Sequence, residues 1–160
     1  YRYKNFKTLI NSFNNSSFLK NNFQIVFFGG EAVSKNERQL YNELNLNNKI
    51  FHINGDDEIL KHLYMTAKAM VSTSDYEGFG LNILEALRYG CIVLAKDIKV
   101  FKEIYSDKII YFNDEETLRI NLEKYLQMSN LQNMNKNNDF VDKFTWEQTC
   151  SKMLKVYENC

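Results

Sequence analysis

The chain has 160 residues, 44% of them hydrophobic and 25% charged, and its 20 basic residues balance 20 acidic ones. This length suits one compact domain with a sizeable core. The zero net charge argues against a nucleic-acid partner, which would favour a basic excess, and no apolar run reaches the roughly 20 residues that span a bilayer. The 12 Phe and 10 Tyr residues exclude a disordered chain. Composition therefore predicts a single soluble domain over residues 1–160.

Apolar periodicity alternates between helix and strand along the chain. Phe6, Ile10 and Phe13 recur at helical spacing behind Asn5, a predicted N-cap. Further on, the sequence predicts strands over residues 24–28, 49–53, 69–72, 92–95 and 109–112. It predicts helices over residues 35–45, 57–67, 81–90, 100–105, 115–128 and 146–157, with a polar, helix-like stretch over 130–138.

Two details of this pattern are expectations about burial and capping. The run 24–28 is continuously apolar and closed by Gly29-Gly30, which predicts a strand buried on both faces. Asp57 is the predicted cap of the helix that follows the second strand.

Strands that alternate with helices predict βαβ units. The fold class expected is therefore α/β, with a Rossmann-like parallel sheet flanked by helices on both faces. In open sheets of this kind, ligands bind outside the carboxyl ends of the strands. A site is accordingly expected among the loops 29–34, 53–57, 73–80 and 96–100.

One of these loops carries a pattern suited to an anionic ligand. Gly78 and Gly80 flank Phe79 where a strand gives way to a helix, and glycine lets the backbone approach a ligand closely. The helix presents free N–H groups near Gly80, Leu81 and Asn82, at the positive end of its dipole. Such a helix start suits a phosphate.

Two carboxylates, Glu77 and Glu85, bracket this turn. A carboxylate accepts hydrogen bonds from neighbouring hydroxyls, such as those of a ribose or a hexose. Phosphate at the amides and hydroxyls at the carboxylates together indicate a sugar nucleotide. The plainer interpretation is that the helix dipole favours Glu near a helix start and that Gly-x-Gly is common in turns.

The segment from Glu77 to Gly90, EGFGLNILEALRYG, resembles the E-x7-E signature of the group 1, family-4 glycosyltransferases. Their usual text is close to E-G-F-G-L-x-x-x-E-A-M-x-x-G. Similar matches, in the family's order, lie at Lys4-Asn5-Phe6, Phe28-Gly29-Gly30-Glu31, Leu60-x-x-Leu63-Tyr64-x-x-Ala67 and Phe144-Thr145-Trp146-Glu147. The chain departs from the family pattern at Ser74, which lacks the usual preceding proline.

The resemblance implies one lobe of a retaining enzyme with the two-lobed GT-B architecture. This chain would be the C-terminal, nucleotide-sugar-binding lobe. The N-terminal lobe, with the acceptor site and a catalytic histidine, would lie outside it, so the chain alone is expected to be inactive. By position, Glu77 would place the donor sugar and Glu85 would hold the ribose, while the backbone of residues 78–81 would face the sugar and the diphosphate.

The resemblance also implies the remaining contacts and partners. Lys4 would lie against the diphosphate, and Gly29 and Gly30 would line the nucleobase. The expected donor is a UDP- or GDP-sugar, used without a metal or another cofactor. The expected acceptor is a glycan or a lipid-linked glycan of bacterial surface polysaccharide synthesis. The full protein would be cytoplasmic, and peripheral association with the inner face of the membrane is left open.

Two other interpretations stay open at this point. A sugar-nucleotide epimerase has a similar two-lobed architecture, although it is not expected to carry the E-x7-E text. A degenerate lobe kept for protein contacts would have no catalytic role, although the intact carboxylates and glycine loop weigh against decay.

Overall fold

The computed structural model describes residues 4–30, 33–128 and 138–158. Its strands are β1 Ile25–Phe28, β2 Ile50–Ile53, β3 Met70–Ser72, β4 Val93–Lys96 and β5 Ile110–Phe112. Its helices are α1 Phe6–Asn14, α2 Ser17–Asn22, α3 Lys35–Glu43, α4 Asp57–Thr66, α5 Leu81–Arg88, α6 Lys99–Tyr105, α7 Glu115–Gln127, α8 Asn138–Val141 and α9 Trp146–Glu158. The predicted polar stretch 130–138 lies almost wholly outside the described residues.

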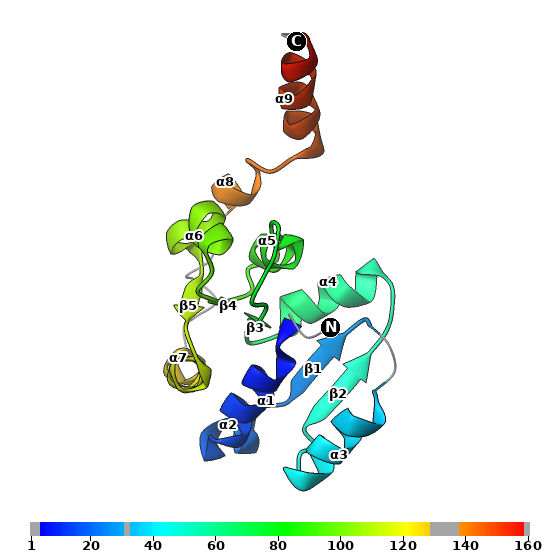
Figure 1. Cartoon of the computed structure of the whole chain (residues 1–160), viewed down its shortest axis with the longest axis vertical. Helices are drawn as coiled ribbons and strands as arrows, with labels where there is room; N and C mark the ends of the chain where they lie inside the picture. The colour runs from blue at the N-terminus through cyan, green and yellow to red at the C-terminus, as the bar shows by residue number, and fades with distance from the viewer. Residues whose placement is uncertain (1–3, 31–32, 129–137, 159–160) are drawn as a thin grey trace.

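The strands pair in parallel, as the sequence predicts, and they form two ladders. β1 pairs with β2, with Ile25 beside Ile50, while β4 lies between β3 and β5. Figure 1 shows α5 and α6 on one side of β4 and β5, and α1 and α7 on the other. The predicted α/β class, with helices on both faces of a parallel sheet, is confirmed.

β4 is the central strand and separates two apolar cores. Leu94 faces a core that it shares with Ile10 of α1 and Leu118 of α7. Val93, its neighbour in the chain, points the other way, into a core that contains Leu87 of α5. This alternation follows from strand geometry, because successive side chains point to opposite faces.

The prediction that residues 24–28 are buried on both faces is wrong. Phe27 packs against the core under α1, but Val26 is 42% exposed and its partner in β2, Phe51, is 41% exposed. The helix after β2, α4, places Tyr64 in the core around α5. The second face of the β1–β2 ladder is therefore only partly covered.

Two predicted caps also differ from the structure. Asn5 occupies the N-cap position of α1, but it has a left-handed backbone (φ 46°) and its side chain makes no capping hydrogen bond. Its amide donates instead to the Asp75 carboxylate at 3.3 Å. α4 is capped by Asp56 rather than Asp57, because the Asp56 carboxylate accepts the N–H of Ile59 at 3.1 Å.

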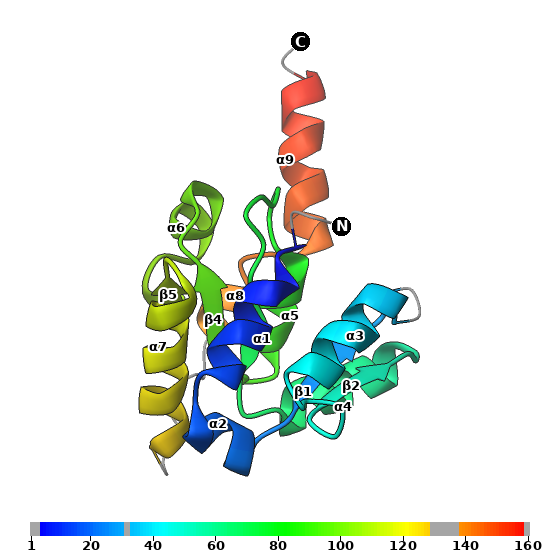
Figure 2. The same cartoon turned by 60° about the horizontal axis from the view of Figure 1, so that its bottom comes forward.

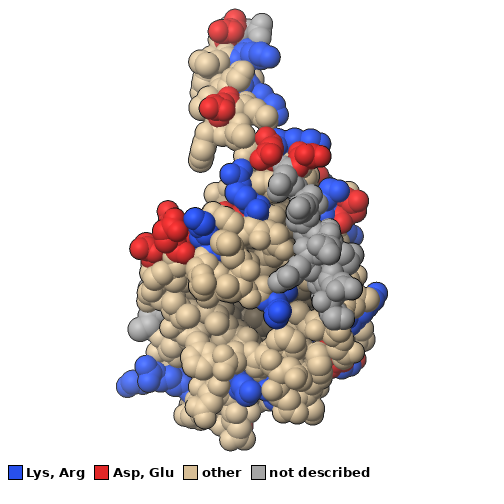
Figure 3. Space-filling view, turned by 180° about the vertical axis from the view of Figure 1, so that it is seen from behind, with Lys and Arg blue, Asp and Glu red and all other residues tan. Residues whose placement is uncertain are grey.

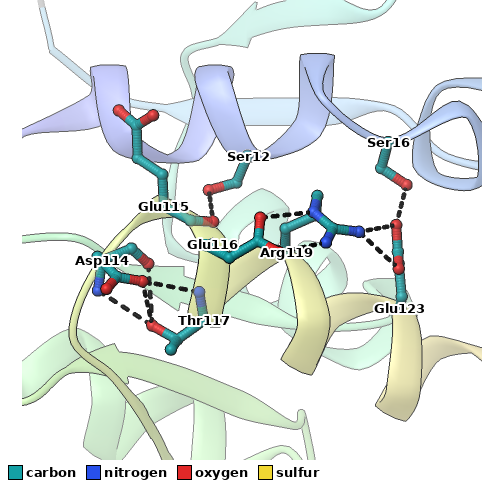
Figure 4. A network of polar contacts seen from close by, with 8 residues as sticks. All are labelled: Ser12, Ser16, Asp114, Glu115, Glu116, Thr117, Arg119 and Glu123. Atoms are coloured by element: carbon teal, nitrogen blue, oxygen red, sulfur yellow. Dashed lines mark hydrogen bonds and ion pairs between the residues drawn. The ribbon is translucent and has the colours of Figure 1, made fainter.

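A polar network fastens α1 and α2 to α7 (Figure 4). The Ser12 hydroxyl donates to the Glu115 carbonyl at 2.8 Å, and the Ser16 hydroxyl donates to the Glu123 carboxylate at 2.6 Å. Arg119 holds the same Glu123 carboxylate through two hydrogen bonds of 3.0 Å. The network sets the position of α1 along α7, and thereby where the N-terminal end of α1 lies.

The last helix projects from the body of the domain, as Figures 1 and 2 show. None of its residues is buried. On the face in Figure 3, charged side chains of both signs are dispersed among uncharged ones. Within the ranges that the structure describes, no helix is both long enough and apolar enough to cross a membrane.

Replacing Ser16 with alanine should lower the free energy of unfolding by about 1–2 kcal/mol. Ser16 is 2% exposed, caps α2 by accepting the N–H of Leu19, and donates to Glu123. The control is Ser17→Ala at the next, exposed position, which should change stability by less than about 0.5 kcal/mol. Urea unfolding measures both variants, and equal losses would show that the Ser16 hydroxyl contributes nothing particular.

Candidate functional site

The loop between β3 and α5 turns into the helix at Gly80. Gly80 has a left-handed backbone (φ 84°), and a Cβ atom at this position would lie 2.7 Å from Cε1 of Phe101. The Tyr105 hydroxyl donates to the Gly80 carbonyl at 2.8 Å, and burial raises the pKa of Tyr105, so the phenol keeps its proton. The turn therefore needs glycine for both its dihedral angle and its lack of a side chain.

The first turn of α5 places backbone N–H groups at the mouth of this loop. The Ile83 N–H is bonded to the Gly80 carbonyl at 2.8 Å and to the Asn82 side-chain oxygen at 3.1 Å. The N–H groups at a helix start have no partner within the helix, so those of Leu81 and Asn82 mark the positive end of the dipole. α5 thus begins at the residues whose backbone amides the sequence predicts to bind a phosphate.

Lys4 and Glu77 meet in space although 73 positions separate them. The Lys4 Nζ atom lies 2.6 Å from Oε1 of Glu77. The Thr73 hydroxyl donates to the Lys4 carbonyl at 2.6 Å, so the backbone before α1 is bound to the same loop. The sequence predicts a donor contact for each of these two side chains, but it predicts neither their ion pair nor the part played by Thr73.

Glu85 lies further along α5 and has a different partner. The Tyr64 hydroxyl of α4 donates to Oε2 of Glu85 at 3.2 Å. Burial, reinforced by the neighbouring Glu85 carboxylate, raises the pKa of Tyr64, so the phenol remains a donor. Tyr64 belongs to one of the family-like motifs in the sequence, but its contact with Glu85 is not predicted there. The signal that could have indicated it is that a buried tyrosine hydroxyl usually finds a partner.

Phe79 presents its backbone rather than its ring to the loop surface. The ring packs edge-on against Phe144 and Tyr105, with centroids 5.5 Å and 6.2 Å away. Gly78 beside it has open space where a Cβ atom would be. The expectation that backbone atoms line this part of the site fits such an arrangement.

Gly29 and Gly30 lie at the carboxyl end of β1, with backbone φ angles of 74° and 85°. The Gly29 N–H donates to the Ile53 carbonyl at 2.9 Å, which joins this loop to the end of β2. A Cβ atom at either glycine would meet nothing within 4 Å. Positive φ, rather than crowding, is therefore what favours glycine at these two positions.

A separate hollow of about 310 Å³ lies between α3 and β2. Its lining residues are Val33, Arg38, Tyr41, Ile50, Phe51 and His52. None of the predicted donor-binding residues is among them. Among residues 4–30, 33–128 and 138–158, no cluster of three His, Cys, Asp or Glu side chains could hold a metal ion.

Solved structures similar to this chain include glycosyltransferases. The similarity to sucrose-phosphate synthase from Thermosynechococcus elongatus covers 99% of this chain and 43% of the synthase chain, with a TM-score of 0.82 and 22% identity. The similarity to Anabaena HepE, solved in complex with UDP and glucose, covers 100% of this chain and 46% of the HepE chain, with a TM-score of 0.84 and 16% identity. At these identities the likeness establishes the fold, which is that of GT-B glycosyltransferases.

Sequence comparison gives the family. The family model described as "Glycosyl transferases group 1" matches residues 1–140, and the chain belongs to that family. The serotype-specific mannosyltransferase WbdA from Escherichia coli is 35% identical over 113 residues, which are 69% of this chain and 14% of that protein. A glycogen synthase from Thermodesulfovibrio yellowstonii is 27% identical over 87% of this chain and 30% of its own length. The chain thus spans well under half of these relatives.

Replacing Gly80 with alanine should lower the free energy of unfolding by about 2 kcal/mol or more, because the new Cβ atom meets buried Phe101 and the backbone has a positive φ. Gly78→Ala is the matched control, since its Cβ atom would enter open space. Thermal or urea unfolding compares the two. A Gly80 variant as stable as the Gly78 variant would contradict this account of the turn.

Proposed function

We propose that this chain is the donor-binding lobe of a retaining glycosyltransferase, which transfers the hexose of a nucleoside diphosphate-hexose to a growing glycan. The observation that carries the proposal is the 2.6 Å contact between Lys4 and Glu77 on the loop that starts α5. It brings a cation and a carboxylate to a helix N-terminus. A diphosphate would bind to the cation and the helix N-terminus, and the hydroxyls of a sugar would bind to the carboxylate.

The chemistry requires positive charge where the leaving group forms. Breaking the anomeric C–O bond leaves a nucleoside diphosphate with growing negative charge beside an oxocarbenium-like sugar. The Lys4 ammonium and the N–H groups of Leu81 and Asn82 would stabilise that charge through preorganised electrostatics. Because these groups supply the charge, we propose a reaction that needs no metal ion.

The carboxylates would place the donor. Glu77 would accept hydrogen bonds from hydroxyls of the hexose. It would act by positioning the hexose, rather than as a covalent nucleophile. Glu85, oriented by the Tyr64 hydroxyl, would accept the hydroxyls of the ribose. Gly29 and Gly30 would line the nucleobase, because they lie at the carboxyl end of β1, where ligands bind in open parallel sheets.

The comparisons favour a particular use for such a lobe. Relatives named as mannosyltransferases support a mannosyl donor, and their serotype and O-antigen names support bacterial surface polysaccharide synthesis. The solved complex of Anabaena HepE contains UDP and glucose, which supports a nucleotide-sugar donor of the same general kind. The acceptor would bind to an N-terminal lobe, in a cytoplasmic protein that acts at or near the inner face of the membrane.

Titration of the 160-residue chain with UDP, GDP and ADP by calorimetry tests the proposal. We expect saturable binding of one nucleotide, and Glu85→Ala should weaken it about tenfold or more, because a charged acceptor for the ribose is lost. Glu43→Ala, at the exposed end of α3, should leave the affinity unchanged. Binding that is absent, or equally weakened by both substitutions, would contradict the assignment.

A further inference from the structure

The ion pair between Lys4 and Glu77 joins two side chains that the proposed function assigns to different parts of the donor. The side chain of Lys4 is 32% exposed and that of Glu77 is 17% exposed, so water shields the pair only partly. A charged hydrogen bond of 2.6 Å in such surroundings is a strong one. A donor that binds both side chains competes with this pair for the Lys4 ammonium and the Glu77 carboxylate.

The backbone holds the two side chains close together. The Thr73 hydroxyl is bonded to the Lys4 carbonyl, and the Asn5 amide is bonded to the Asp75 carboxylate, so two further contacts join the start of α1 to the loop. Neither contact uses the side chains of Lys4 or Glu77. A ligand can therefore draw the Lys4 ammonium away by side-chain rotation. The Glu77 carboxylate then stays in place and can accept hydrogen bonds from the ligand instead.

The charges around the pair are balanced as well. Lys96 lies 3.8 Å from the Asp75 carboxylate, so two lysines and two carboxylates gather on this side of the loop. A nucleoside diphosphate carries several negative charges, and it meets side chains whose charges sum to zero. The hydroxyls of a hexose carry no charge and leave that balance as it is, but they donate hydrogen bonds to a carboxylate and can take the place of the lysine as its partner.

We propose that the Lys4–Glu77 pair makes the site prefer a nucleoside diphosphate-hexose over the free nucleoside diphosphate. With the hexose attached, its hydroxyls replace the lysine at Glu77 and the phosphates take Lys4, so both charges keep partners. With the free diphosphate, Lys4 is again taken, but Glu77 faces the terminal phosphate as a second negative charge. This like-charge cost falls on the product alone and favours its release. The inference rests on the proposed function, from which it takes the roles of Lys4 and Glu77.

Glu77→Gln tests the inference, because glutamine keeps the size and removes the charge. Calorimetry on the 160-residue chain should show UDP or GDP binding about three- to tenfold more tightly to the variant. UDP-glucose or GDP-mannose should bind no more tightly, because a neutral amide is a weaker acceptor for hydroxyls. The ratio of the two dissociation constants, free diphosphate over diphosphate-hexose, should fall at least about threefold.

Two further variants separate the pair from simpler causes. In a Lys4→Met background, Glu77→Gln should improve the affinity for free UDP or GDP by a smaller factor, because no lysine is released. The Thr73 hydrogen bond, which uses the Lys4 carbonyl, survives in that background. Glu85→Gln should weaken the binding of the free nucleotide and of its hexose conjugate by the same factor, because the ribose is common to both.

The outcomes distinguish the inference from the function on which it rests. Nucleotide binding with an unchanged ratio in Glu77→Gln, or an equal gain in the Lys4→Met background, would overturn the inference and leave the donor lobe intact. Failure of the wild-type chain and every variant to bind any of the four ligands would overturn both. Far-ultraviolet circular dichroism spectra that coincide for wild type and Glu77→Gln establish that the loop substitution leaves the fold unchanged.

Discussion

The hydrogen bond from Thr73 to the Lys4 carbonyl is the contact on which the arrangement of the candidate site depends. Thr73 is 2% exposed, and its hydroxyl reaches the carbonyl at 2.6 Å, so the bond forms in shielded surroundings where breaking it leaves a buried group unpaired. It ties Lys4, two residues before α1, to the loop that leads to α5. Thr73 occupies the position before Ser74 where the family usually has proline, a residue with no hydroxyl to donate.

The rest of the domain supports both ends of this contact. On one side, α7 holds α1 through Ser12, which is completely buried, and through the network around Glu123. On the other side, the loop is held where Tyr105 binds the Gly80 carbonyl. The ion pair of Lys4 with Glu77 therefore depends on supports from two segments far apart in the sequence, as well as on the attraction of two charges.

Local signals in the sequence predicted the elements well and the contacts poorly. The change between strand and helix periodicity, with glycine at positions such as Gly80, predicted the order of the strands and the loop between β3 and α5, but it missed the short helix α2. Asn5 was expected to cap α1, but the nearby Asp75 carboxylate competes for its amide. The partnership of Tyr64 with Glu85 likewise depends on how α4 packs against α5. Such contacts join distant segments, so no local pattern in one sequence encodes them.

Backbone NMR of the 160-residue chain, titrated with the nucleotide that binds it, tests the central claim most directly. The account predicts that the amide signals of Gly80, Leu81 and Asn82 shift together and saturate, because their N–H groups would meet the diphosphate. Signals on the α3 side of the α3–β2 hollow, such as that of Arg38, should move little, because the hollow contains none of the proposed donor contacts. Shifts centred on the hollow, with the start of α5 unchanged, would contradict the account.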